Sequence, residues 1–185
     1  MRNTSYEQTT SASMGVCDKH LVSLTAPTSF AAEQYQGLRL TIERMARSRA
    51  VKVIAISSPA AGDGKTVTAV NLAGALARGA DERVLLIDAD LRRPSIASLF
   101  GIRNSEAGLA DTLSDDKIGF TQVVKHARGL GLSVITAGIA RGRVSEILRS
   151  PRLEQLLTEA RSRYGYIILD TPQESYEKGG KGSTC

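Results

Sequence analysis

The chain is poor in the residue types that mark several large classes of protein. It has two cysteines in 185 residues, Cys17 and Cys185, near opposite ends, which excludes a disulfide framework and fits no metal-binding spacing. It has no tryptophan, and its five tyrosines and three phenylalanines argue against a stacking platform for single-stranded nucleic acid. No apolar run approaches the length of a membrane span, and the first residues lack the apolar stretch of a signal peptide. These absences predict a cytoplasmic protein with no specific nucleic-acid partner.

What is present suffices for one folded domain. Hydrophobic residues make up 42% of the chain, which excludes wholesale disorder, and the net charge of +5 permits contact with phosphates or an anionic membrane. Residues 1–28 are polar and without sustained periodicity, so we predict a flexible N-terminal arm. We expect the folded domain to span residues 29–173. Residues 174–185 contain no apolar run and predict a disordered tail.

Short apolar runs alternate with helical patterns within the expected domain. Four β-branched or aliphatic runs predict buried strands, at residues 51–56, 84–87, 132–135 and 166–169. A further helix is predicted before the first strand, with one apolar face made by Tyr35, Leu38, Ile42 and Met45. This alternation is typical of an α/β fold, in which a parallel sheet is covered by helices on both sides.

A glycine-rich turn at residues 59–66 (Pro-Ala-Ala-Gly-Asp-Gly-Lys-Thr) joins the first strand to the next helix. Glycines let successive backbone N–H groups point at one phosphate, and the start of the helix adds its positive end. Lys65 can reach the β- and γ-phosphates, and the Thr66 hydroxyl suits Mg²⁺. The strict pattern has Gly where this chain has Pro59, and a turn without a ligand is the alternative. The predicted nucleotide-binding residues are Ala61, Gly62, Asp63, Gly64, Lys65, Thr66 and Val67.

Carboxylates follow two of the predicted strands. Asp88 and Asp90 come directly after the run at 84–87, and Asp170 ends the run at 166–169. Open α/β sheets bind ligands at the carboxyl ends of their strands, where acidic residues suit metal coordination or proton transfer. Two alternatives stay open from the sequence. The first pair caps the helix that Pro94 begins, and Asp170 is an ordinary residue of a strand-to-loop turn.

Together these motifs resemble the Walker A, Walker A′ and Walker B motifs of bacterial tyrosine kinases of the capsule and exopolysaccharide type. They are residues 59–66, the Asp-x-Asp-x-Arg of residues 88–92, and Asp-Thr-Pro at 170–172. That family lies within the deviant-Walker ATPases that include the MinD and ParA proteins. Ala60 stands where MinD and ParA proteins carry their signature lysine, which favours the kinase branch. The resemblance implies a three-layer P-loop NTPase fold with a mostly parallel sheet.

The resemblance also implies a role for each matching residue. Lys65, Asp88 and Asp90 would be catalytic, with Asp88 acting at the γ-phosphate as base or as ligand of a metal-bound water. Thr66, Asp88 and Asp170 would place Mg²⁺. The cofactors implied are ATP and Mg²⁺, and the reaction implied is phosphate transfer from ATP to tyrosine, chiefly within the kinase's own C-terminal tyrosine cluster.

The helix before the first strand matches a family segment used for ring-like self-association. Glu33, Arg39 and Ile42 match that segment, whereas Gln36 and Thr41 replace an expected Arg and Asn. The helix from Glu33 to Ile42 is therefore a candidate for homo-oligomer contacts, and a solvated basic face over a core stripe is the alternative. Family members without their own membrane span work with a membrane adaptor of a polysaccharide export system. Such a partner would hold this chain at the inner face of the membrane.

The resemblance fades at the C-terminal end. Gln173 replaces the family's second Pro, and Tyr176 is the only tyrosine that follows. The family continues with further strands, so this sheet is expected to lack its C-terminal strands and to leave residues 51–56 at an edge. A frameshift after codon 173 would explain the abrupt change. Three functions follow: a tyrosine kinase module impaired by truncation, a MinD- or ParA-like ATPase that positions partners on membrane or DNA, and an inactive fragment.

Overall fold

The computed structural model describes residues 18–49, 52–60, 62–79, 83–103, 105–127 and 131–173. Their centre is a five-stranded sheet with the order β1-β5-β2-β4-β3. The strands are β1 (Val53–Ile56), β2 (Val84–Asp88), β3 (Lys125–Ala127), β4 (Leu132–Ile135) and β5 (Tyr166–Asp170). Every neighbouring pair is parallel except β3 with β4, which is antiparallel. The mostly parallel α/β sheet predicted from the sequence is confirmed.

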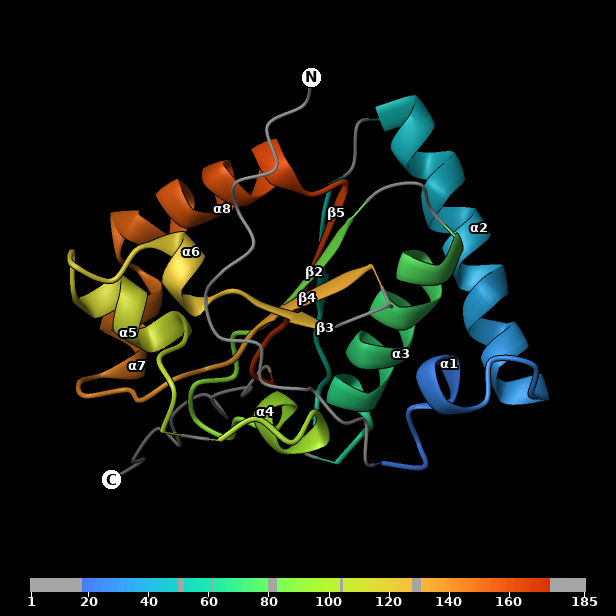
Figure 1. Cartoon of the computed structure of the whole chain (residues 1–185), viewed down its shortest axis with the longest axis horizontal. Helices are drawn as coiled ribbons and strands as arrows, with labels where there is room; N and C mark the ends of the chain where they lie inside the picture. Colours follow the sequence, from blue (N-terminus) through green and yellow to red (C-terminus); the bar gives the residue numbers. More distant parts are fainter. Residues whose placement is uncertain are drawn as a thin grey trace, which may run out of the picture.

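Helices cover both faces of the sheet and complete the three layers of the fold. They are α1 (Val22–Thr25), α2 (Phe30–Arg49), α3 (Lys65–Gly79), α4 (Ile96–Leu99), α5 (Leu109–Ser114), α6 (Phe120–Val123), α7 (Val144–Leu148) and α8 (Pro151–Arg163). Figure 1 shows α1, α2 and α3 on one side of the sheet and α5, α6 and α8 on the other. No helix in the described part of the chain is long and apolar enough to cross a bilayer.

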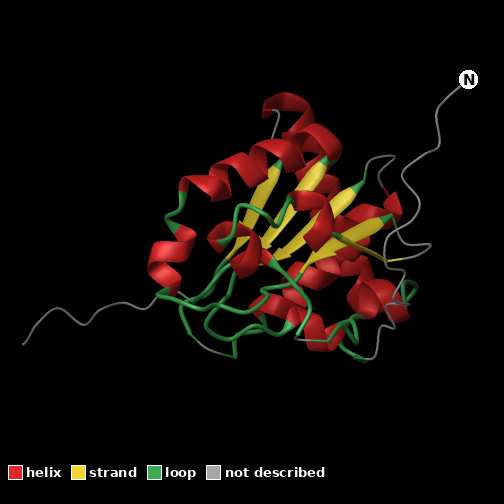
Figure 2. Ribbon diagram, turned by 60° about the vertical axis from the view of Figure 1, so that its left-hand side comes forward, coloured by secondary structure: helices red, strands yellow, loops and turns green. Residues whose placement is uncertain are grey.

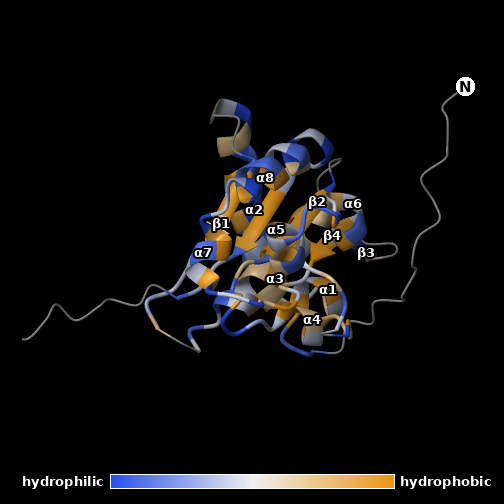
Figure 3. Ribbon diagram, turned by 90° about the vertical axis from the view of Figure 1, so that its left-hand side faces the viewer, coloured by the Kyte–Doolittle hydropathy of each residue, from blue (hydrophilic) through white to orange (hydrophobic). Residues whose placement is uncertain are grey.

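The core explains why the strands read as continuous apolar runs. All five residues of β2 are buried, because helices pack on both of its faces. One apolar cluster joins β2 to α3 and α4, and a second joins the opposite face of β2 to α5 and α8. Figure 3 shows the strands as a hydrophobic layer, with hydrophilic residues on the outer surfaces of the helices.

Helix α2 turns a different face toward α3 from the one predicted. Ile42 is buried as expected, but Leu38 and Met45 are 40% and 44% exposed. The inward face instead carries Arg39, whose guanidinium occupies the space that a methyl group on Gly79 would fill. A long arginine stem can cover apolar surface while its charge lies near the carbonyl end of a helix, here that of α3. Apolar periodicity alone therefore assigned part of this face incorrectly.

Residues 18–28, which the sequence analysis assigned to the flexible arm, pack against α3. Leu21 is fully buried, and so is Asn71 of α3. The Asn71 amide donates a hydrogen bond to the carbonyl of His20 at 2.8 Å and accepts one from the N–H of Ser23 at 2.9 Å. The packed part of the chain therefore begins before residue 29. The rest of the predicted arm, residues 1–17, lies outside the described residues, as does the predicted tail.

Strand β1 forms one edge of the sheet, as the sequence predicted. Among the described residues it pairs with β5 alone. Its four residues, Val-Ile-Ala-Ile, carry no charge, and Ala55 is exposed. An uncharged edge of this kind can pair with a strand from another chain.

The turn before α5 brings two glycines into backbone contact. A Cβ at Gly108 would lie 2.3 Å from the carbonyl oxygen of Thr136 and 2.4 Å from the backbone nitrogen of Gly138. Asp111 of α5 strengthens this junction, because its carboxylate accepts the N–H of Gly108 at 2.9 Å and that of Ile139 at 3.1 Å. The contact fastens α5 to the loop that follows β4.

We expect Gly108→Ala to destabilise the fold by about 2–3 kcal/mol, since backbone atoms cannot move aside as a side-chain tip can. The φ of −145° at Gly108 is open to any residue, so the effect is steric. Gly119 begins α6 in a similar way, but the nearest atom to its Cβ position is 3.6 Å away. Gly119→Ala should therefore change the unfolding free energy by less than about 0.5 kcal/mol. Denaturant unfolding compares the two variants, and equal midpoints would contradict the contact.

Candidate active site

Three neighbouring strands end at the same edge of the sheet, and each leads into a predicted motif. Asp170 is the last residue of β5 and lies level with Ile56 of β1 and Asp88 of β2. The P-loop, residues 59–66, follows β1, and Asp90 follows β2. Because the three strands are parallel, motifs far apart in the sequence meet at their carboxyl ends. Figure 2 shows the loops of this edge gathered on one side of the strands.

The P-loop has the backbone that a phosphate-binding turn requires. Gly62 and Gly64 adopt φ values of 88° and 82°, which side-chain-bearing residues rarely take. Apart from the glycine's own chain neighbours, no atom of the described residues lies within 4 Å of a Cβ built at either glycine, so a ligand can approach the loop closely. The Asp63 carboxylate accepts the Ala60 N–H at 3.0 Å and closes the turn. Ala61, also predicted to bind nucleotide, lies outside the described residues.

Helix α3 begins at Lys65 and directs its amino end toward this loop. Its first turn contains Thr66 and Val67, so backbone N–H groups of the predicted nucleotide-binding residues stand at the positive end of the helix. An anion placed over the loop would meet both the glycine-rich turn and the helix terminus.

Lys65 is the charged centre of the site. Its Nζ lies 2.9 Å from Oδ1 of Asp170 and 3.2 Å from Oδ2 of Asp90. The Asp170 side chain is fully buried, and those of Lys65 and Asp90 are each 11% exposed. Burial alone would lower the pKa of Lys65, but the hydrogen bonds and charges of Asp170 and Asp90 raise it. The ammonium is thus the counter-ion of two poorly solvated carboxylates.

Thr66 lies beside the same carboxylate. Its hydroxyl donates a hydrogen bond to Oδ2 of Asp170 at 2.6 Å, so both oxygens of Asp170 are engaged, one by Lys65 and one by Thr66. The structure therefore brings together two of the three residues predicted to place a metal.

Asp88, the third of them, is fully buried. Its Oδ2 accepts the N–H groups of Ser95 at 3.1 Å and Ile96 at 3.0 Å, so the capping alternative is realised at the start of α4. Its Oδ1 is buried and has no hydrogen-bond partner among the described residues. Burial raises the pKa of Asp88 to about 6, with the charge of Asp170 adding to the rise. A carboxyl group that titrates near neutrality suits proton transfer, so capping and chemistry are compatible here.

Sequence reasoning missed Ser95, which connects two parts of the site. Its backbone N–H contacts Asp88, and its hydroxyl donates to the Thr66 hydroxyl at 3.2 Å. The only signal was a serine next to Pro94, which by itself favours a helix cap. The contact with Thr66 depends on two segments that meet only in the folded chain.

The oxygen atoms at this edge suit Mg²⁺, which prefers carboxylate, hydroxyl and water oxygens. The buried, unpartnered Oδ1 of Asp88 is the observation that favours a cation here. The described residues contain no group of three His, Cys, Asp or Glu side chains that could hold a metal by themselves. Mg²⁺ is usually held by one or two carboxylates together with substrate phosphates, so this donor set fits a cation that binds with a nucleotide.

Comparison with known proteins identifies the group to which this chain belongs. A family profile described as an AAA domain matches residues 51–175. The tyrosine-protein kinase YwqD of Bacillus subtilis (strain 168) is 36% identical over 154 residues, which are 83% of this chain and 64% of YwqD. The chain belongs to the bacterial tyrosine kinase family. The crystal structure of the chimerical protein CapA2B2 agrees, with a TM-score of 0.78 and 29% identity over 86% of this chain and 69% of that chain.

The kinase domain of Escherichia coli tyrosine kinase ETK gives a TM-score of 0.77 and 30% identity, covering 92% of this chain and 64% of that chain. The chain thus spans 64% of YwqD and 64% of the ETK kinase domain, but only 20% of the tyrosine-protein kinase etk of Escherichia coli (strain K12). MinD of Pyrococcus horikoshii, solved with Mg-ADP, gives a TM-score of 0.56 at 21% identity. That likeness shows the fold alone.

Proposed function

We propose that this bacterial tyrosine kinase family member binds ATP and transfers the γ-phosphate to tyrosine hydroxyls. The observation that carries the proposal is the position of Lys65 at the P-loop, between the carboxylates of Asp90 and Asp170. The ammonium group of Lys65 can exchange these ion pairs for contacts with the phosphates of a nucleotide. The buried carboxyl group of Asp88 lies close by.

Each residue has a role in this proposal. The backbone of residues 61–67 wraps the phosphates, and Lys65 exchanges its carboxylate partners for β- and γ-phosphate oxygens. Asp88 takes the proton of the tyrosine hydroxyl or holds a metal-bound water, and Asp90 supports it. Thr66, Asp88 and Asp170 would hold Mg²⁺, which when bound neutralises charge on the phosphates.

We also propose a setting for this activity. The kinase works in the cytoplasm, at the inner face of the membrane, with an adaptor of a polysaccharide export system that regulates capsule or exopolysaccharide synthesis. Self-association uses α2, whose side chains Phe30, Leu38, Leu40 and Met45 are between 40% and 78% exposed. Of the three matched positions on this helix, Glu33 is exposed, whereas Ile42 and Arg39 face α3.

The test is the appearance of phosphotyrosine when the purified chain is incubated with ATP, Mg²⁺ and a tyrosine-containing peptide. The kinase proposal expects phosphotyrosine that EDTA abolishes, because the phosphates need the metal. Phosphate release without phosphotyrosine would instead indicate a nucleotide-switched ATPase of the MinD or ParA kind. If neither phosphotyrosine nor released phosphate were formed, the chain would be an inactive fragment.

A further inference from the structure

Arginines stand on two adjacent loops at the carboxyl edge of the sheet. Arg92 and Arg93 follow β2, and Arg141 and Arg143 follow β4; all four are exposed. Strands β2 and β4 are parallel neighbours with Ile87 level with Ile135, so the two loops leave the sheet side by side. The P-loop lies at the same edge of the sheet, because β1, β5 and β2 are also parallel. We call these four residues the arginine rim.

The charges of the rim are largely unneutralised. Arg143 lies 3.5 Å from Glu146, and both side chains are exposed, at 84% and 69%, so this pair is weak. The other three arginines form no ion pair with any described residue. Two carboxylates near the rim already have hydrogen-bond partners: Asp90 binds Lys65, and Asp111 accepts the N–H of Ile139 in the loop after β4.

The arginine rim is connected to the candidate active site through Arg93. The N–H of Arg93 donates to the carbonyl and to Oδ1 of Asp90, whose Oδ2 lies 3.2 Å from Lys65. A protein segment that brings a hydroxyl to a phosphate held by Lys65 must pass close to the loop after β2. The residues on either side of that hydroxyl would then face guanidinium groups.

Resting on the proposed kinase activity, we propose that the arginine rim selects tyrosine segments flanked by Asp and Glu. Guanidinium groups bind carboxylates through paired hydrogen bonds, and a surface of one charge speeds the encounter with a partner of the opposite charge. In the reaction, the tyrosine oxygen forms a bond to the γ-phosphorus. The bond between the γ-phosphorus and the β,γ-bridging oxygen breaks at the same time. ADP leaves, and the phenolic proton passes to Asp88. An anionic membrane is the less suitable partner, because a membrane bound to the rim would block the access of a tyrosine to the active site.

The test uses three peptides that share a central Ser-Tyr and carry two Glu, two Gln or two Lys on each side. Peptide binding to the chain loaded with a non-hydrolysable ATP analogue is measured by fluorescence anisotropy, and phosphotyrosine formation is measured separately. We expect the Glu peptide to bind at least about tenfold more tightly than the Gln peptide, and the Lys peptide to bind worst. Arg141→Gln with Arg143→Gln should reduce the Glu-over-Gln preference to about threefold or less.

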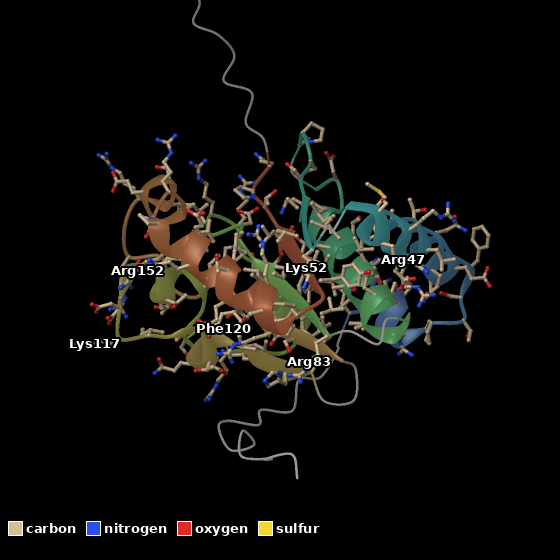
Figure 4. All side chains as sticks on the ribbon, turned by 90° about the horizontal axis from the view of Figure 1, so that it is seen from above. Arg47, Lys52, Arg83, Lys117, Phe120 and Arg152 are labelled. Carbon is tan, nitrogen blue, oxygen red and sulfur yellow. The ribbon has the colours of Figure 1, made fainter. Side chains whose placement is uncertain are left out.

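The matched control replaces two exposed arginines at the opposite end of the strands. Arg47 and Arg83 lie there, on α2 and just before β2 (Figure 4), and Arg47→Gln with Arg83→Gln should leave the preference intact. Equal binding of the Glu and Gln peptides would overturn the proposal, and so would a preference that survives the rim substitutions or falls equally in the control. Rim-dependent sedimentation with phosphatidylglycerol vesicles, without peptide preference, would assign the rim to a membrane instead. Preferential binding without phosphotyrosine would support the rim while refuting the kinase activity.

Discussion

Replacing Lys65 with methionine is expected to weaken ATP binding at least about 100-fold, because charge-assisted contacts to the phosphates are lost. Methionine keeps the length and the apolar stem of lysine without its charge. Isothermal titration of ATP in the presence of Mg²⁺ measures the change. The matched control is Lys52→Met, since Lys52 is exposed before β1 and its Nζ donates a hydrogen bond to the Arg161 carbonyl at 3.4 Å, away from the P-loop. That variant should bind ATP like the parent chain.

The same substitution has a second effect, in the absence of nucleotide. Lys65 neutralises Asp90 and Asp170, and the latter is fully buried. Removing one partner of a buried ion pair destabilises a fold by about 3–5 kcal/mol, and the 11% exposure of Lys65 places this loss at the lower end. Lys65→Met should therefore unfold at a lower denaturant concentration than Lys52→Met. Unchanged affinity or unchanged stability would show that Lys65 does not have the position described.

Replacing Asp88 with asparagine is expected to have opposite effects on activity and on stability. Asparagine can accept the same hydrogen bonds from Ser95 and Ile96, but it can neither take a proton nor hold a cation as a carboxylate does. Phosphotyrosine formation should fall at least about 100-fold, whether Asp88 acts as base or through a metal-bound water. ATP binding should change much less than in Lys65→Met.

The stability of Asp88→Asn follows from the sign of the pKa shift. Burial raises the pKa of Asp88 from 3.8 to about 6, so the folded chain favours the protonated acid and is destabilised once the group ionises. The destabilisation is small near pH 4, grows as the pH rises toward 6, and levels off at about 3 kcal/mol above pH 7. An asparagine side chain at this position does not ionise, so the variant escapes this loss.

Without nucleotide or Mg²⁺, Asp88→Asn should therefore be more stable than the parent chain at pH 8, and the two should converge near pH 4. Denaturant unfolding at pH 4, 5 and 8 measures the difference. Ser95→Ala is a useful control, because it changes the hydroxyl that contacts Thr66 and leaves the Asp88 carboxylate in place. A pH-independent difference between Asp88→Asn and the parent would show that Asp88 is not a buried, ionised group.

The chemistry-bearing motifs could be read from the sequence because each is local. The run at 84–87 and the aspartates after it form one continuous segment, and so does the P-loop with the strand before it. Parallel pairing then brings these segments together without further information. What the sequence could not supply was the pairing of Lys65 with Asp90 and Asp170, which lie 25 and 105 residues away.

Other features of the fold were not predicted from the sequence, and the physical reason differs from case to case. Strand β3, Lys-His-Ala, has no β-branched or aromatic residue, so it carries no strand signal of its own. The short segment around Leu21 is too brief to show helical periodicity, yet Leu21 is fully buried. On α2, Arg39 places its guanidinium beside Gly79 at the end of α3, an arrangement that an apolar count cannot anticipate.

The most direct test of the site is a calorimetric titration of the purified chain with ATP, with and without Mg²⁺. A P-loop whose lysine and helix terminus cradle the phosphates, beside oxygen atoms suited to a cation, predicts one nucleotide bound per chain and clearly tighter binding with Mg²⁺. Absence of binding at millimolar ATP, or equal affinity with and without the metal, would contradict the assignment of Lys65, Thr66 and Asp170 to a magnesium–nucleotide site.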